Sequence, residues 1–266
     1  MKVEQAELIA RKAIIELGVA LEKGHSERLK KFLSAMAKLH NYSVRNLMLI
    51  MSQRPDATVV AGRRTWKSLG RRGKKGAKPI LILAPVVGKK ARGRTSQTKR
   101  GARGPVGFRA AYLFDVTDTM GEPLPQLGVV HGDPGEYTER LKKFIAARGI
   151  ELKYTNDILP TESQYIRGKM TVLPGLSPAQ EFATLAHETA HALLHRKPGR
   201  RDGPRWVRET EAEAVAYVVC EAVGVKSPSS ADYVHLSGGD AGTLADSLDR
   251  VQRASAEILA AILPGD

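Results

Sequence analysis

Residues 177–195 constrain the chain more than any other segment, because they specify a helix and a metal site together. Residues 177–180, Ser-Pro-Ala-Gln, suit a helix N-terminus: a serine cap, a proline at the first helical position and a glutamine that closes a capping box. The apolar run that follows predicts a helix with His187 and His191 four residues apart on one face. Two imidazoles at this spacing can bind one divalent ion, and Glu188 stands where it can take a proton from a metal-bound water.

The next predicted helix offers the third ligand. Glu209 and Glu213 are one turn apart on one face, whereas Glu211 points elsewhere and suits an exposed acidic face. The pattern Glu-x-x-Ala-Glu, 18 residues after His191, is similar to the second-helix signature of gluzincin metallopeptidases. That similarity implies Glu209 as the metal ligand and Glu213 as the carboxylate that fixes an imidazole tautomer, with the reverse assignment left open. His195 has the wrong spacing for a metzincin ligand and is expected at the helix end or behind a ligand.

Three protein ligands leave one position of a four-coordinate ion open for water, which is typical of a catalytic site. Zinc is the expected ion, although two histidines and a glutamate also accept Mn2+ or Co2+. A bound ion would lower the pKa of its water toward about 7. A chance pair of histidines is the alternative interpretation, and the apolar side chains around the pair weaken it.

Basic residues are concentrated in the N-terminal half. The net charge is +14, yet residues 1–130 hold 26 Lys and Arg against 9 Asp and Glu, and the remainder is slightly acidic. Between Ala57 and Phe114 there are 16 basic residues and no acidic one. Basic runs are often only solvated faces, but here strand-like apolar segments and an aromatic are interleaved with the cations. This pattern favours an ordered surface that binds a polyanion.

Cysteine content and hydropathy bear on the compartment. The single Cys220 leaves no internal disulfide and no cysteine-based metal cluster. No apolar run approaches the ~20 residues of a membrane span, and an N-terminus containing Glu4 and Glu7 does not suit a secretory signal. We therefore expect a cytoplasmic protein without a membrane partner.

The periodicity of apolar residues predicts an α+β protein with two domains. In the N-terminal domain, residues 1–122, helices are expected over 3–21, 26–39 and 41–50 and strands over 57–61, 79–87 and 108–116. Asn41 is the expected cap of the third helix. The C-terminal domain, residues 135–266, is expected to have a helix over 137–148 and strands over 151–154 and 164–173 before the metal helices. Residues 123–134 are the predicted linker, and the basic segment 88–104 is predicted to be a flexible loop.

The order and spacing of these segments resemble those of ArdC-type antirestriction proteins of conjugative plasmids and other mobile elements. The resemblance covers nearly the whole chain and rests on residues 41–50, 60–66, 69–76, 80–85, 112–117, 187–191, 209–220 and 229–234. It implies an N-terminal domain that binds single-stranded DNA and a C-terminal gluzincin-like metallopeptidase domain related to the ImmA/IrrE group.

The N-terminal half has the residue types that single-stranded DNA requires, namely cations for phosphates and flat rings for bases. The candidate contacts are Tyr42, Arg45, Asn46, Arg63, Arg64, Trp66, Lys67, Arg71, Arg72, Lys74 and Lys75. Two of them have an alternative interpretation: Trp66 suits a core position as well as a stacking platform, and Asn46 can hydrogen-bond the backbone inside the fold.

The sequence thus predicts an antirestriction protein that binds single-stranded DNA and has a zinc metallopeptidase domain, protecting incoming mobile-element DNA from host restriction. One alternative is a regulatory zinc endopeptidase that cleaves a repressor or host restriction protein. Another is a binding-only module with a non-hydrolytic metal site.

Overall fold

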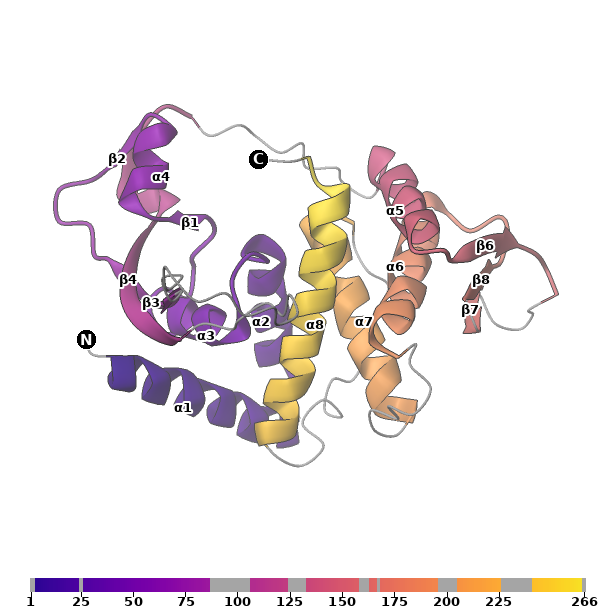
Figure 1. Cartoon of the computed structure of the whole chain (residues 1–266), viewed down its shortest axis with the longest axis horizontal. Helices are drawn as coiled ribbons and strands as arrows, with labels where there is room; N and C mark the ends of the chain where they lie inside the picture. Colours follow the sequence, from indigo (N-terminus) through magenta and orange to yellow (C-terminus); the bar gives the residue numbers. More distant parts are fainter. Residues whose placement is uncertain are drawn as a thin grey trace, which may run out of the picture. The chain divides into compact units, whose positions relative to one another are not determined.

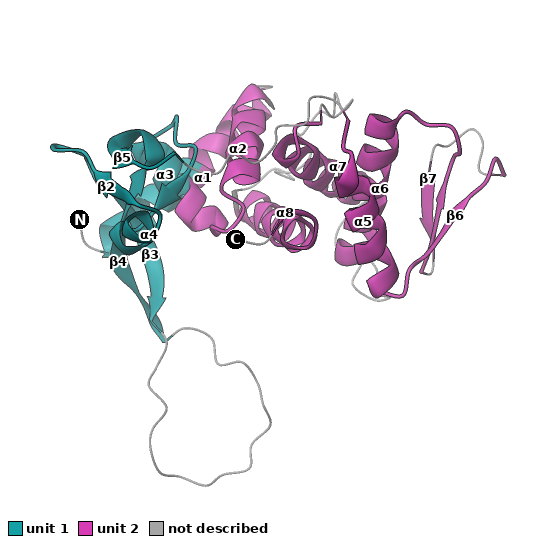
Figure 2. Cartoon of the chain, turned by 90° about the horizontal axis from the view of Figure 1, so that it is seen from above, with its two compact units in different colours: residues 1–13, 48–123 teal, residues 14–47, 124–266 magenta. Residues whose placement is uncertain are grey.

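A computed structural model describes residues 3–23, 26–86, 106–123, 133–157, 163–166, 168–195, 205–225 and 241–264. The predicted basic loop, most of the predicted linker and the segment 229–234 lie outside these residues. The chain divides into two compact units (Figure 2). Unit 1 comprises residues 1–13 and 48–123, and unit 2 comprises residues 14–47 and 124–266.

The units divide the N-terminal region differently from the predicted domains. Helix α2 (Ser26–Lys38) packs against α7 (Arg205–Ala222) in unit 2. The hydroxyl groups of Ser34 and Tyr217 are 3.0 Å apart, and the Gln252 side chain donates a hydrogen bond to the backbone oxygen of His40. Residues 14–47, expected in the DNA-binding domain, therefore belong to the same compact unit as the metal helices.

Unit 1 is built on an antiparallel sheet with the strand order β1-β4-β3. These strands are β1 (Val60–Ala61), β3 (Ile80–Val86) and β4 (Gly107–Asp115), and each falls within a predicted strand to within one residue. The sequence did not predict the short helix α4 (Arg63–Ser68), the 3-10 turn η1 (Val116–Asp118) or the strand pair β2 (Arg71–Gly73) and β5 (Thr119–Gly121).

Two longer helices, α1 (Val3–Glu22) and α3 (Val44–Gln53), contribute residues to both units. The predicted cap of α3 was wrong. The helix begins at Val44, and the Ser43 hydroxyl accepts a hydrogen bond from the Asn46 backbone at 3.4 Å.

Trp66 lies in the core of unit 1. It is 1% exposed, and its indole nitrogen donates a 2.9 Å hydrogen bond to the backbone oxygen of Phe114. Of the two interpretations of Trp66, the structure favours the core position, because a ring this buried presents no face to a base. Its predicted stacking role is therefore corrected.

Unit 2 combines a helical bundle with a small mixed sheet. The helices α5 (Glu136–Ala147), α6 (Pro178–Leu194), α7 and α8 (Ala241–Ile262) pack against one another (Figure 1). The strands are β6 (Glu151–Tyr154), β7 (Ser163–Ile166) and β8 (Lys169–Val172), with β8 parallel to β6 and antiparallel to β7. The predicted α+β class is confirmed, whereas α8 was not predicted. No helix in the described part of the chain is long and apolar enough to span a membrane.

Candidate metal centre

Helix α6 is fixed at its start and along its apolar face. The Ser177 hydroxyl accepts a hydrogen bond from the Gln180 backbone, and the Gln180 side chain accepts one from the Ser177 backbone, so the predicted capping box is present. Phe182, Leu185 and Ala186 are fully buried along the helix. This anchoring sets the rotation of α6 and therefore the direction of its histidines.

His187, His191 and Glu209 converge at the junction of α6 and α7. The Nε2 atoms of the two histidines are 3.1 Å apart. The Glu209 Oε2 atom is 3.6 Å from Nε2 of His187 and 3.3 Å from Nε2 of His191. Donors bound tetrahedrally at about 2.0–2.1 Å from a zinc ion lie roughly 3.3 Å from one another. The donor set and its spacing therefore fit a divalent ion.

The outer nitrogen of each histidine has its own partner. Nδ1 of His187 lies 3.2 Å from Oε2 of Glu213. Nδ1 of His191 lies 3.1 Å from Nδ1 of His195. Because Nδ1 is engaged in both rings, Nε2 is the nitrogen that each presents to an ion. Glu213 occupies the supporting position that the sequence assigned to it.

The pKa values of His187 and Glu209 are shifted by the hydrogen bonds between these groups. Burial acts to lower the pKa of His187, but the hydrogen bonds that the imidazole donates to Glu209 and Glu213 outweigh it and raise that pKa to about 9. Hydrogen bonds from His187 and then His191 hold the pKa of Glu209 well below its usual range. Negative charge from the carboxylates thus offsets positive charge at the imidazoles, and an ion would take the place of the shared protons.

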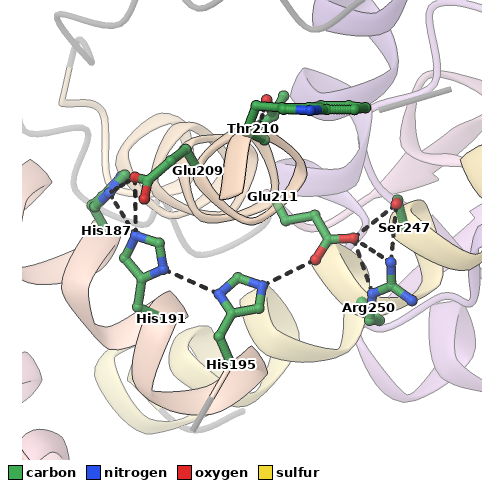
Figure 3. Close-up of polar contacts among 9 residues, drawn as sticks. His187, His191, His195, Glu209, Thr210, Glu211, Ser247 and Arg250 are labelled. Atoms are coloured by element: carbon green, nitrogen blue, oxygen red, sulfur yellow. Dashed lines mark hydrogen bonds and ion pairs between the residues drawn. The ribbon is translucent and has the colours of Figure 1, made fainter. Parts of the chain in front are cut away.

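A buried chain of polar contacts extends from His191 to α8 (Figure 3). Nε2 of His195 is 3.1 Å from Oε2 of Glu211, whose other oxygen accepts hydrogen bonds from Ser247 at 2.7 Å and from Arg250. Burial acts to raise the pKa of Glu211, but the hydrogen bonds from His195, Arg250 and Ser247 outweigh it and lower the pKa below its usual value, leaving the carboxylate ionised.

Glu211 was expected on an exposed acidic face, and that expectation was wrong. The side chain is 0% exposed, because α8 covers this side of α7 and supplies Ser247 and Arg250. His195 lies behind the ligand candidate His191, which was one of the two positions predicted for it. No pattern in the sequence indicated the partners of Glu211 on α8.

Glu188, the predicted proton acceptor, is 5% exposed and accepts a 2.5 Å hydrogen bond from the Ser163 hydroxyl on β7. It directly follows His187 in α6, and its charge contributes to the raised pKa of His187. Three residues in the sequence are candidates to polarise a substrate carbonyl, namely Tyr217, Tyr233 and His235. The Tyr217 hydroxyl lies 3.0 Å from that of Ser34. The other two candidates, Tyr233 and His235, lie outside the described residues.

The structure separates the predicted DNA contacts into two groups. Those at residues 63–75 lie in unit 1, whereas Tyr42, Arg45 and Asn46 lie in unit 2. Burial raises the pKa of the half-buried Tyr42. In unit 1 the exposed candidates are Arg63, Arg64, Lys67, Arg72, Lys74 and Lys75.

Arg71 differs from its exposed neighbours because its guanidinium is bound to the strand pair that it spans. It donates to the Thr119 hydroxyl at 2.9 Å and to the backbone oxygens of Thr119 and Glu122. All of these acceptors are uncharged, so they fix the position of the guanidinium without neutralising its positive charge.

A cavity of about 530 Å³ lies between α4, β2 and β5. Its lining residues are Lys67, Gly70, Arg71, Arg72, Met120 and Gly121. The two glycines allow close backbone contact, since a Cβ on Gly121 (φ +135°) would lie 2.3 Å from the Gly70 oxygen. The cavity therefore presents three cations and an apolar methionine to solvent.

The N-terminal region of the chain is similar to a known protein family. Residues 12–114 match the family described as the N-terminal domain of anti-restriction factor ArdC. This region is therefore similar to the ArdC N-terminal domain. The match confirms the resemblance predicted from the sequence for this part of the chain.

Relatives extend over more of the chain. An uncharacterized protein of Bacillus anthracis is 27% identical over 250 residues, covering 78% of this chain and 42% of the relative. The chain therefore spans less than half of that relative's length. Two crystal structures of the antirestriction ArdC protein from plasmid R388 each align over 82% of both chains. The metal-free one is 22% identical with a TM-score of 0.48, and the Mn(II)-bound one is 23% identical with a TM-score of 0.49.

Proposed function

We propose that this chain is an antirestriction protein that binds single-stranded DNA and holds one divalent metal ion at His187, His191 and Glu209. Its role is to protect incoming mobile-element DNA from host restriction. The proposal is carried by the convergence of three metal-binding donors within 3.6 Å in a chain with an ArdC-type N-terminal domain.

The residues around the proposed metal site favour hydrolysis as its chemistry. A divalent ion bound here supplies an acidified water at neutral pH. Glu188 accepts a proton, and the hydrogen bond from Ser163 holds its carboxylate in place. We assign peptidase-type cleavage of a host restriction protein to this centre, with zinc as the expected ion and Mn2+ or Co2+ as ions that the same donors accept.

The exposed cations of unit 1 support binding to single-stranded DNA. Lys67 and Arg72 line the cavity between α4, β2 and β5, and no carboxylate among the described residues pairs with either. Arg71 adds a third, fixed cation. Phosphates of a flexible strand follow such basic surfaces, so affinity should fall steeply as salt rises.

The substitution Glu188→Gln separates hydrolysis from binding. The variant keeps all three metal ligands but loses the proton acceptor, so we expect full metal content and DNA affinity with loss of proteolysis and of protection. The measurements are metal content, an unbiased proteolysis screen and transformation of a restricting host with unmodified DNA. Glu221→Gln, an exposed carboxylate on α7, is the control.

Two outcomes would change the proposal. If Glu188→Gln protects DNA as well as the wild type, the metal serves binding only. If the wild type cleaves a repressor but gives no protection, the protein is a regulatory endopeptidase instead.

A further inference from the structure

Two exposed aromatic rings lie on β4, the middle strand of the unit 1 sheet. Tyr112 is 52% exposed and Phe108 is 40% exposed. We infer that these two rings, in place of the buried Trp66, are the platforms on which bases of single-stranded DNA stack. This inference rests on the proposed DNA-binding function and names the side chains that provide its stacking contacts.

The two rings share one face of the strand. Alternate residues of a strand point the same way, so Phe108, Ala110 and Tyr112 lie in one row. The ends of this row are about 13 Å apart along the strand. Ala110 lies between the rings, and its methyl group is too short to cover either of them. The row therefore carries two partly exposed rings at separate positions along the strand.

Phe114 continues the row at its inner end, where the ring is covered. It is 5% exposed, and the Arg63 guanidinium lies over it at 5.2 Å from the ring centre. Arg63 thus places a positive charge at the point where the buried part of the row gives way to Tyr112. An aromatic face next to a cation matches a nucleotide, which has a flat base and an anionic phosphate.

The charge of the sequence segment that contains the row favours a polyanion over an apolar protein segment. The sequence has 16 basic residues and no acidic one between Ala57 and Phe114. The nearest acidic residues after β4 are already engaged: Asp115 is buried in hydrogen bonds, and Asp118 pairs with Arg54. An apolar peptide would gain nothing from this charge, whereas single-stranded DNA uses both the rings and the cations.

The test measures binding of a fluorescein-labelled oligothymidylate by anisotropy over a series of salt concentrations. Each ring should contribute about 5- to 150-fold to affinity, so the double variant Phe108→Ala/Tyr112→Ala should bind at least about 25-fold more weakly than the wild type. The slope of log affinity against log salt should not change, because no phosphate contact is removed. In contrast, Arg63→Ala should reduce that slope by about 1.

Further variants separate stacking from a loss of structure. Tyr112→Phe keeps the ring and should bind like the wild type, while Tyr112→Leu keeps an apolar side chain without the ring and should bind weakly. Trp206→Ala removes a 43% exposed aromatic of unit 2 and should have no effect.

The outcomes distinguish the inference from the function on which it rests. If the wild type binds the oligonucleotide but Tyr112→Leu and the double variant bind equally well, the rings are not platforms and the inference is wrong. A changed salt slope in the double variant would also contradict it. If the wild type itself does not bind, the proposed DNA-binding function fails.

Discussion

The two histidines of the metal centre differ in what holds their outer nitrogens. Glu213 contacts Nδ1 of His187 directly, whereas His191 is held by His195, which is itself held by the buried Glu211. In metal sites these supporting hydrogen bonds orient the imidazole and strengthen it as a ligand. His195 is therefore a positioning residue for the proposed site.

Replacing His195 should weaken metal binding even though it is not itself a ligand. We expect His195→Ala to lower Zn2+ affinity by about 10- to 100-fold, because His191 loses the partner that fixes its ring. Titration calorimetry with Zn2+ measures this. His195→Gln, which can still hydrogen-bond to His191, should recover part of the affinity, and an unaltered affinity in His195→Ala would show that the contact has no positioning role.

The sequence predicted the ligands better than their support. The pair His187 and His191 follows from helical spacing, which is a local property, and the spacing of Glu209 and Glu213 predicted their shared face. The burial of Glu211 depends on a helix some thirty residues further along the chain, so no pattern around Glu211 itself could indicate it. Trp66 is similar, since only the packing of α4 on the sheet distinguishes a core ring from an exposed one.

At the scale of the elements, Asp115 joins three segments of unit 1. It is 1% exposed at the end of β4, and its carboxylate accepts hydrogen bonds from the Thr58 backbone ahead of β1 and from the Thr117 backbone in η1, both at 2.9 Å. Burial raises its pKa, but these bonds and the charge of Arg54 outweigh that effect and lower the pKa below its usual value of 3.8.

The stability that Asp115 contributes should disappear in acid. A carboxylate with a lowered folded-state pKa stabilises the fold fully above the unfolded value of 3.8 and progressively less as pH falls through the folded one. We expect Asp115→Asn to reduce the free energy of unfolding by about 2 kcal/mol at pH 7 and by less at an acid pH below 3.8. Urea denaturation followed by tryptophan fluorescence measures the difference, with the exposed Glu4→Gln as the control; an equal loss at both pH values would refute the assignment.

The long, periodic elements could be predicted and the short ones could not. Helix α6 has its start signal and apolar face within its own sequence, and β3 and β4 are apolar runs. In contrast, β2 and β5 are three residues each and form only because they pair with each other. The basic sequence around β2 indicated a polyanion surface but not the cavity, which the pairing with β5 creates.

Over the whole molecule, charge and chemistry are divided between the two halves of the sequence. Residues 1–130 hold all of the excess positive charge, and the proposed metal ligands lie in the slightly acidic remainder. An antirestriction protein of the proposed type needs both parts, one to hold DNA and one to act on a host protein. The first part is similar to the ArdC N-terminal domain, and in the second α6 and α7 bring together three groups that could hold a metal ion.

The central claim is that His187, His191 and Glu209 bind one divalent ion. The most direct measurement is the metal content of purified protein after loading with Zn2+ and exhaustive dialysis, for the wild type, His187→Ala, Glu209→Gln and the control Cys220→Ser. We predict one ion per chain in the wild type and the control, and far less in both ligand variants. One tightly held ion per chain in His187→Ala would contradict the account.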